Sequence, residues 1–424
     1  MLQVKFIVEN PEFVIERLAV KNFDAKPIVD RILELYKQKN ALQRQIESLK
    51  AQQNSIAKQI GQLYKQGQRE QAEEAKRKSA ELKEQIKQLE AQFEPLEREI
   101  FEQVVKLPNL PHESVPPGKS SEDNEIVRSG GQKPQFDFEP LPHWELAKKY
   151  NLIDFELGPK LTGSAFPVFI DRGARLERAL ITYFLDKARE AGFTEYIPPF
   201  LVNETTAFGT GQLPDKEGQM YRTEQDNFYL IPTAEVPLTN IYRDMILDEE
   251  QLPVKLTAYT PCFRREAGSY GKDVRGLNRV HQFDKVEIVQ LAHPEKSYQV
   301  LEQMVEYVEG LVQSLGLPYR IVRLCGGDLS FTSALTYDFE VYSAGQDRWL
   351  EVSSVSNFET FQSNRMKIRF RPKGSKKTQL VHTLNGSALA LPRIVAAILE
   401  NYQTKDGIRI PQVLVPYLGF DFIS

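Results

Sequence analysis

The chain has 424 residues, 41% of them hydrophobic and 26% charged, with a formal net charge of −4. This length is enough for two domains with a full hydrophobic core, and the small net charge excludes a global field that attracts nucleic acid or membranes. Two cysteines, Cys262 and Cys325, are too few for a disulfide framework or a thiolate metal cage, and they suit a reducing compartment. The sequence has neither a signal peptide nor an apolar run of about 18 residues, so we expect a cytoplasmic protein with no membrane contact.

Residues 1–106 have the composition of a helical region, because only two of the 24 glycines and three of the 25 prolines fall there. A capped start at Asn10-Pro11-Glu12 predicts a short helix from about Pro11 to Val20. Two heptad runs follow, and we expect them to form an antiparallel helical hairpin, an arm of about residues 29–104. The runs are Ile32, Leu35, Lys39, Leu42, Ile46, Leu49, Gln53, Ile56, Ile60, Leu63 and then Ala72, Ala75, Ser79, Leu82, Ile86, Leu89, Phe93, Leu96, Ile100.

The heptads alone leave a zipper between two chains open, although the short turn around Gly61 and Gly67 favours pairing within one chain. Pro95 lies in the second run and predicts a kink there. Basic residues outnumber acidic ones near the tip, a pattern that fits nucleic-acid binding and a solvated helix surface equally well. The basic residues are Lys58, Lys65, Arg69, Lys76, Arg77 and Lys78.

Residues 107–120 contain several prolines and glycines and predict a linker. Residues 121–424 then mix strand-like and helical patterns without regular alternation. This mixture predicts an α+β domain with a mostly antiparallel sheet flanked by helices. The expected strands are Val254–Phe263, Arg279–Gln290, Thr336–Val341 and Arg348–Phe358, and the expected helices are Arg175–Gly192, Tyr298–Leu315 and Gly386–Asn401.

Several familiar catalytic patterns are missing from the sequence. No phosphate-binding Gly-x-x-x-x-Gly-Lys-Ser/Thr loop, dinucleotide fingerprint or Gly-x-Ser-x-Gly elbow occurs, and the five histidines show no metal-ligand spacing. A segment from Pro261 to Glu287 offers another way to hold a nucleotide. It predicts a hairpin with Arg264 and Glu266 at the end of a strand and the cations Lys272, Arg275 and Arg279 in its loop.

Other polar residues sit at the ends of apolar segments. Thr233 and Glu235 lie between two prolines, and Arg393 follows Gly386 in a segment that predicts a helix start. Glu351 and Ser354 are three apart on an expected strand, so they point to opposite faces unless the strand bends. Each of these residues alone fits an ordinary structural role.

Taken together, these segments resemble the bacterial type of seryl-tRNA synthetase over nearly the whole chain. The resemblance implies a class II synthetase core, a homodimer, ATP and Mg²⁺ without zinc, and an arm that binds the long variable arm of tRNA-Ser. It is also compatible with charging of tRNA-Sec. The segments that carry it are 9–12, 209–214, 232–240, 263–276, 280–287, 351–354, 356–359, 362–370 and 383–390.

The resemblance implies a role for each matching residue. Arg264 bridges the α-phosphate and the serine carboxylate, Glu266 contacts adenosine, Phe283 stacks on adenine and Arg393 meets the γ-phosphate. Glu351 and Ser354 hold Mg²⁺, which prefers oxygen ligands. The ATP site further includes Arg265, Val280, Val352 and Ser353, and the serine pocket comprises Thr233, Ala234, Glu235, Arg264, Glu287, Asn385 and Ser387.

Within that pocket we expect Glu287 and Ser387 to recognise the hydroxyl, and Thr233 with Glu235 to lie near the ammonium. Two other functions remain open: a ligase that loads an amino acid onto a carrier protein, and a non-catalytic synthetase paralogue. The long arm argues against the first, and the retained phosphate-handling residues argue against the second. The helix from Arg175 is the first candidate for a dimer interface.

Overall fold

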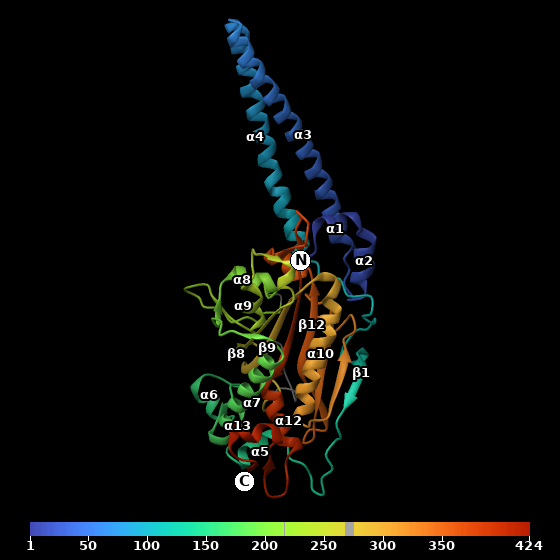
Figure 1. Cartoon of the computed structure of the whole chain (residues 1–424), viewed down its shortest axis with the longest axis vertical. Coiled ribbons are helices and arrows are strands. Elements are labelled where there is room, and N and C mark those ends of the chain that lie inside the picture. The colour runs from blue at the N-terminus through green and yellow to red at the C-terminus, as the bar shows by residue number, and fades with distance from the viewer. Residues whose placement is uncertain (216, 268–274) are drawn as a thin grey trace. The chain divides into compact units, whose positions relative to one another are not determined.

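The computed structural model describes residues 1–215, 217–267 and 275–424. It contains two compact units (Figure 1). One comprises Met1–Ala19 and Phe23–Pro108, and the other comprises Val20–Asn22 and Asn109–Ser424.

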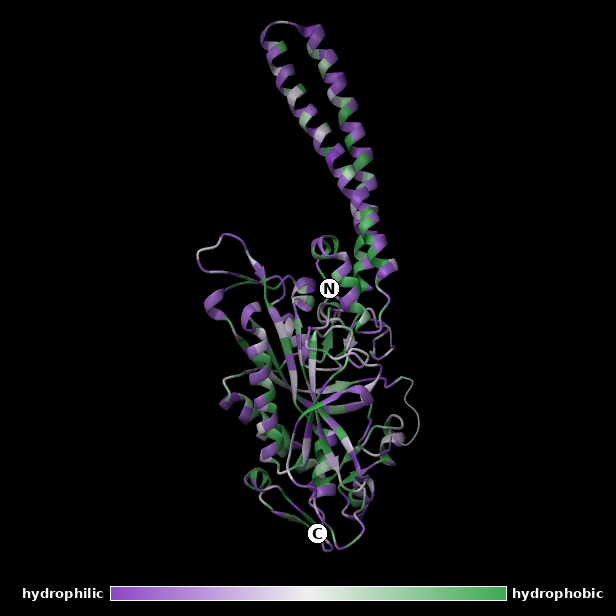
Figure 2. Cartoon of the chain, turned by 90° about the vertical axis from the view of Figure 1, so that its right-hand side faces the viewer, coloured by the Kyte–Doolittle hydropathy of each residue, from purple (hydrophilic) through white to green (hydrophobic). Residues whose placement is uncertain are grey.

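The N-terminal unit is helical throughout its regular structure: α1 spans Val4–Glu9, α2 Pro11–Ala19, α3 Lys26–Lys65 and α4 Arg69–Val105. Helices α3 and α4 pack against each other as an antiparallel pair, which confirms the predicted hairpin arm. Residues of the heptad runs are buried between them, and hydrophobic positions alternate with hydrophilic ones along both helices (Figure 2). Helix α1 was not predicted; α4 continues through Pro95.

Ion pairs between the two helices hold their register. Arg31 contacts Glu99 at 2.6 Å, Lys39 contacts Glu97 at 2.7 Å, and Lys50 contacts Glu90 at 2.7 Å. Lys39 occupies a seam position and also lies 5.1 Å from the centre of the Phe93 ring. A lysine at a seam position favours one register over others, because a shifted pairing would bury its ammonium group without a partner.

The second unit is built on an eight-stranded sheet in the order β1-β10-β11-β12-β15-β9-β8-β4. Within this sheet, as far as its residues are described, only the β4–β8 pair is parallel, so the predicted mostly antiparallel α+β architecture is confirmed. The strands are β1 Glu125–Gly130, β4 Thr194–Glu195, β8 Val254–Phe263, β9 Gln282–Ala292, β10 Tyr319–Arg323, β11 Leu335–Ser343, β12 Arg348–Glu359 and β15 His382–Ala390.

Smaller sheets and helices surround this one. The small sheets are β14-β13-β7 (Gln379–Leu380, Arg369–Arg371, Ile246–Asp248), β16-β17 (Ile408–Arg409, Phe422–Ile423), β2-β3 (Ile153–Asp154, Val168–Phe169) and β5-β6 (Leu201–Val202, Tyr229–Leu230). The helices are α5 His143–Lys149, α6 Leu157–Leu161, α7 Asp171–Glu190, α8 Glu204–Thr210, α9 Glu235–Asn240, α10 Ser297–Ser314, α11 Phe361–Met366, α12 Leu391–Asn401 and α13 Val415–Leu418.

The main hydrophobic core lies between the sheet and helices α7, α10 and α12. Side chains alternate along each strand, so one face of the sheet joins this core and the other does not. On β9 the core residues are Val286 and Ile288, whereas Lys285 and Glu287 point into a cavity on the other side. The sheet therefore provides a polar face that is backed by a rigid core.

One predicted helix was placed wrongly at its start. Residues 386–390 belong to β15, because Gly386 pairs with both β9 and β12 and Ser387 and Ala390 pair with β9, and α12 begins only at Leu391. Pro392 lies in the first turn of α12, where a missing N–H costs nothing. Asn385 and Ser387 consequently stand on a central strand, and Arg393 is the third residue of the helix.

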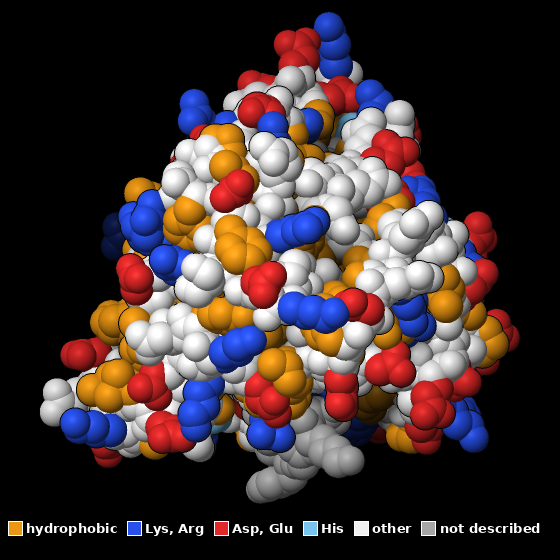
Figure 3. All heavy atoms as spheres, turned by 90° about the horizontal axis from the view of Figure 1, so that it is seen from below, with side chains coloured by type: hydrophobic (Ala, Val, Ile, Leu, Met, Phe, Trp, Pro, Cys, Tyr) orange, Lys and Arg blue, Asp and Glu red, His pale blue; other side chains and the backbone are white. Residues whose placement is uncertain are grey.

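The surface of the second unit seen from below carries basic and acidic side chains interspersed with hydrophobic ones (Figure 3). In the described part of the chain, no helix combines the length and the apolar character that crossing a membrane requires.

Candidate active site

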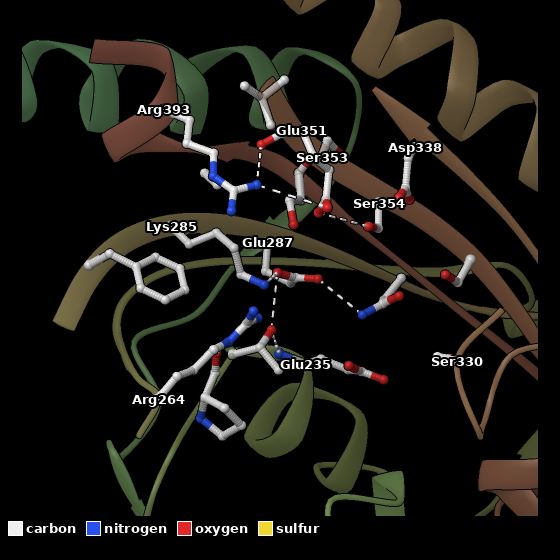
Figure 4. A pocket seen from close by; sticks show the side chains of 18 of the residues that line it. Glu235, Arg264, Lys285, Glu287, Ser330, Asp338, Glu351, Ser353, Ser354 and Arg393 are labelled. Carbon is white, nitrogen blue, oxygen red and sulfur yellow. Dashed lines mark hydrogen bonds and ion pairs between the residues drawn. The ribbon is translucent and has the colours of Figure 1, made fainter. Parts of the chain in front are cut away.

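A cavity of about 680 Å³ lies on the polar face of the large sheet, with β9, β11, β12 and β15 as its floor (Figure 4). Every predicted site residue lines it except Ala234 and Arg265. Ala234 is fully buried beside the lining residues Thr233 and Glu235. The lining residues from the prediction are Thr233, Glu235, Arg264, Glu266, Val280, Phe283, Glu287, Glu351, Val352, Ser353, Ser354, Asn385, Ser387 and Arg393.

Glu287 stands at the centre of this floor with 1% of its surface exposed. One carboxylate oxygen is 2.6 Å from Lys285 Nζ and accepts a hydrogen bond from Thr233 Oγ1 at 3.1 Å. The other accepts from Asn385 Nδ2 at 3.1 Å. Burial raises the pKa of Glu287, and Lys285 opposes that shift. Three different elements thus hold one carboxylate in a fixed orientation.

Glu235, at the start of α9, is a second buried carboxyl group, but its surroundings differ. It accepts a hydrogen bond from Gln362 Nε2 at 2.6 Å, and Gln362 is itself held by Thr383 Oγ1 at 2.7 Å. No ion pair to Glu235 occurs among the described residues. Burial, followed by the nearby charge of Glu287, raises the pKa of Glu235 to about 7. An arriving cation would find here a carboxyl group that lacks a charged partner.

Arg264 follows the end of β8 and faces the cavity. Its Nε donates to the carbonyl of Pro232 at 3.4 Å, and its guanidinium lies 5.2 Å from the centre of the Phe283 ring. No carboxylate among the described residues forms an ion pair with Arg264. Its planar fork of donors is therefore available to an anionic group in the cavity.

The other strand-end acid, Glu266, forms an ion pair with Arg279 at 3.2 Å. Arg279 and Asn278 also line the cavity and lie in the segment that leads back into β9. Lys272, which we predicted to belong to the cationic loop, lies outside the described residues. Arg275 is placed away from the cavity lining, with its guanidinium 4.6 Å from the centre of the Trp144 ring.

Glu351 and Ser354 share the cavity because β12 has the bend that their spacing requires. The pairing of β11 with β12 skips Val352, since Phe339 faces Ser353 while Glu340 faces Glu351. This β-bulge turns both side chains to one face, where Ser354 Oγ lies 3.4 Å from Glu351 Oε1. Arg393 Nη1 donates to the Glu351 carbonyl at 2.7 Å, which sets it at the same end of the cavity.

Asp338 was missed as a site residue, although it lies opposite Ser354 on β11. Burial and the charge of Glu351 raise its pKa well above the usual value, and its Oδ1 is buried without a hydrogen-bond partner. Two carboxylates and a hydroxyl that face the same space suit a hard divalent cation such as Mg²⁺. The described residues contain no cluster of three or more His, Cys, Asp or Glu placed to hold a metal.

Lys285 and Gln362 were also missed. Lys285 could have been found, because Phe283, Lys285 and Glu287 alternate on one face of the same strand. Asp338 carries a similar signal, since Thr336 and Asp338 follow the same spacing. Gln362 lies in α11, more than 100 residues from Glu235 in sequence, and no local pattern announces their contact.

Comparison with known proteins agrees with this geometry. Residues 1–111 match the seryl-tRNA synthetase N-terminal domain, and residues 219–402 match the core domain of class II tRNA synthetases specific for G, H, P, S and T. A serine–tRNA ligase of Salinibacter ruber is 49% identical over 99% of this chain and 98% of its own length. The chain belongs to the serine–tRNA ligase family. A family member from Thermodesulfovibrio yellowstonii is 46% identical over the full length of both chains.

Solved structures of the family extend the agreement to the fold. The seryl-tRNA synthetase of Pyrococcus horikoshii, solved with ATP, has a TM-score of 0.94 and 38% identity, covering 100% of this chain and 99% of that one. The cytoplasmic serine–tRNA ligase of Naegleria fowleri, solved with AMP, has a TM-score of 0.90 and 29% identity with the same coverage. Membership of the serine–tRNA ligase family and the class II fold, both inferred from the sequence, are confirmed.

Proposed function

We propose that this protein activates serine with ATP to seryl-adenylate and transfers the seryl group to the 3′ end of tRNA-Ser, with tRNA-Sec as a second acceptor. The observation that carries this proposal is the pairing of opposite charges across one cavity. Among the described residues, the Arg264 guanidinium has no carboxylate partner and the Glu235 carboxyl group has no cationic partner. The carboxylate and the ammonium of a free amino acid supply both missing partners.

In the first step the serine carboxylate attacks the α-phosphorus of ATP, and the bond to the pyrophosphate oxygen breaks. Arg264 would hold the attacking carboxylate and the α-phosphate together, with Phe283 as the platform for adenine and Glu266 near the edge of the adenine. Arg393 would face the leaving phosphates. No general base is required, because a carboxylate is already ionised at neutral pH. Catalysis then rests on positioning and on neutralising phosphate charge.

Magnesium fits the same end of the cavity. Glu351, Ser354 and Asp338 would hold it, and it would neutralise charge on the phosphates of ATP. The α-phosphate side of ATP would then lie between this cation and Arg264.

Selection of serine would depend on Glu287 and Ser387, with Asn385 holding the Glu287 carboxylate. A buried carboxylate positioned to accept a hydrogen bond from the serine hydroxyl would bind alanine poorly. Alanine has no hydroxyl, so part of the hydrogen-bonding capacity of the carboxylate would stay unsatisfied. Threonine has the hydroxyl and must be excluded by shape. The ammonium would lie near Thr233 and Glu235.

We further propose that residues 1–106 form a tRNA-binding domain, joined by linker 107–120 to catalytic domain 121–424, and that the arm binds the long variable arm of tRNA-Ser. The protein would act as a cytoplasmic homodimer. An exposed apolar surface after α7 supports the dimer: Ile197 is 87% exposed, and Phe200, Leu201 and Phe228 are also exposed beside it on or near the β5–β6 pair. A second copy of the chain would cover this surface.

The test is serine-dependent exchange of pyrophosphate into ATP, followed by aminoacylation of tRNA-Ser. Exchange should occur with serine and hardly at all with alanine, threonine or glycine. Equal exchange with another amino acid would refute the pocket assignment. Transfer of the activated serine to a carrier protein instead of tRNA would favour the carrier-protein ligase, and no exchange with any amino acid would favour a non-catalytic paralogue.

A further inference from the structure

His143, at the start of α5, is completely buried and lies outside the cavity lining. Its Nδ1 is 2.7 Å from Glu400 Oε1, and its Nε2 accepts a hydrogen bond from the backbone N–H of Leu277 at 2.8 Å. A backbone N–H can only donate, so Nε2 carries no proton and Nδ1 carries the proton shared with Glu400. The imidazole is therefore neutral and fixed in one tautomer.

Glu400 makes this arrangement rigid. Its carboxylate also accepts from the backbone N–H of His143 at 2.9 Å, from Gly345 N at 2.9 Å and from the Ser343 hydroxyl. Burial alone would raise the pKa of Glu400, but its interactions with His143 and Ser343 hold the pKa below its usual value. These hydrogen bonds to both carboxylate oxygens fix the position of Glu400 beside the imidazole.

Leu277 belongs to the short segment that closes the cavity on the side of Arg393. The side chain of the next residue, Asn278, donates to Gln346 Oε1 at 2.8 Å, and its carbonyl accepts from Arg393 Nε at 3.0 Å. Gln346 in turn donates to Glu400 Oε1 at 3.1 Å. The hydrogen bonds thus form a circuit from Leu277 through His143, Glu400 and Gln346 to Asn278, and from there to the arginine in the cavity.

Gly276, the residue before Leu277, lies very close to His143. Gly276 has φ +63°, and a Cβ atom there would lie 2.2 Å from His143 Nε2. The Arg275 guanidinium lies over the ring of Trp144, the neighbour of His143, so the residues on both sides of Gly276 are held by the start of α5. Arg393 and Glu400 are seven residues apart on α12, two turns along one side of the helix.

We propose that His143 is a positioning residue for ATP. Its neutral imidazole holds Leu277 and so fixes Asn278, Arg279 and Val280, which line the cavity, relative to α12 and Arg393. This proposal rests on the proposed function, since the group positioned is the one assigned to the leaving phosphates. It predicts an effect on ATP that serine does not share, because Glu235 and Glu287 are held by Gln362, Lys285, Thr233 and Asn385 instead.

Two variants distinguish the contact made by Nδ1 from the contact made by Nε2. His143→Asn keeps a donor at the position of Nδ1 but is too short to accept from Leu277, whereas His143→Gln offers one donor and one acceptor. His382→Phe is the control, since His382 is a half-buried histidine bonded to Ser297 at 2.7 Å and does not line the cavity. His143→Phe, which removes both contacts at constant ring size, completes the set.

The measurement is the KM for ATP and for serine in pyrophosphate exchange, together with titration calorimetry of α,β-methylene-ATP. We expect His143→Asn and His143→Phe to raise the KM and Kd for the nucleotide about tenfold, because a buried N–H loses its acceptor. The KM for serine should stay within about twofold, His143→Gln should recover most of the loss, and His382→Phe should change neither constant.

Equal increases in both KM values, or unchanged nucleotide binding in His143→Asn, would show that His143 serves the fold alone and would overturn the proposal. If His143→Phe does not fold, His143→Asn and His143→Gln still decide the matter. The wild-type protein could bind the nucleotide analogue and yet show no serine-dependent exchange. This result would refute the proposed function, and the calorimetric comparison of the variants would then decide whether His143 positions the nucleotide.

Discussion

Serine binding should depend on the ionisation of Glu235. Burial raises the pKa of this carboxyl group to about 7, and the charge of Glu287 adds to the shift. The group has 6% of its surface exposed and is hydrogen-bonded by a neutral amide, so solvent gives its charge little stabilisation. A protonated Glu235 offers no negative charge to an ammonium group. We therefore expect kcat/KM for serine to fall as the pH drops below 7.

The size of the effect follows from the pKa. With a pKa of about 7, about nine-tenths of the Glu235 groups are ionised at pH 8 and about one-tenth at pH 6. If only the ionised form accepts the ammonium, kcat/KM for serine falls about tenfold between these values. The elevated pKa corresponds to about 3 kcal/mol of lost stabilisation of the charge in the empty site. Serine regains part of this free energy when it binds.

The assay is pyrophosphate exchange from pH 6 to 8.5, with serine far below its KM and ATP saturating. The control is Glu235→Gln, which keeps the oxygen that accepts from Gln362 but cannot titrate. Its activity should be low and should show no inflection near pH 7. A wild-type profile that is flat between pH 6 and 8, or the same inflection in Glu235→Gln, would refute the assignment of the ammonium to Glu235.

The same group makes a prediction about the stability of the free protein. An acid whose folded-state pKa exceeds its unfolded value binds more protons when folded, so stability falls as the pH rises from the unfolded value of 4.5 towards 7. Glu235→Gln removes this penalty. The variant should therefore have a higher Tm than the wild type at pH 8 without serine, and the difference should shrink at pH 5.

Three further predictions concern other parts of the site and the arm. Arg264→Ala should abolish exchange while leaving the Tm within a few degrees, because among the described residues its side chain makes one long hydrogen bond, 3.4 Å to the carbonyl of Pro232; near-normal exchange would contradict its role. Asp338→Asn should raise the Mg²⁺ concentration needed for half-maximal exchange several-fold, and an unchanged Mg²⁺ titration would exclude it as a ligand. Replacing residues 43–93 with a short turn, which retains the Lys39–Glu97 ion pair, should spare exchange and abolish charging of tRNA-Ser; loss of both would make the arm structural.

The sequence predicted best the features that depend on local periodicity. Strand β8 has the predicted limits, and helices α7 and α10 differ from their predicted limits by a few residues. These elements could be predicted because an element that buries one face has apolar residues at a regular spacing. The segment 386–390 misled the prediction, since its small apolar residues fit both a helix and a strand buried on two sides. Only its pairing with β9 and β12, contacts distant in sequence, decides between them.

In the candidate site, too, local patterns could be predicted and contacts distant in sequence could not. The spacing of Glu351 and Ser354 was enough to require a bend in the strand, and the structure has a β-bulge there. The partner of Glu235 could not be found in this way, because Gln362 reaches it from a different element. Likewise, nothing near His143 in the sequence points to Leu277 or Glu400. The individual roles of the site residues stay predictions until the variants are measured.

The two carboxyl groups of the pocket, Glu287 and Glu235, differ in whether a cation is paired with them. This difference affects which substrate the site selects. Glu287 forms an ion pair with Lys285 at 2.6 Å, so its negative charge is compensated before any ligand binds. Its oxygens can then act as hydrogen-bond acceptors. Glu235 and Arg264 have no such ion-pair partners among the described residues. An amine without a carboxylate would leave Arg264 without an anionic partner, and an acid without an ammonium would leave Glu235 without a cationic partner. The unpaired charges thus favour an α-amino acid over either half alone, while the paired carboxylate is free to distinguish serine from alanine by its hydroxyl.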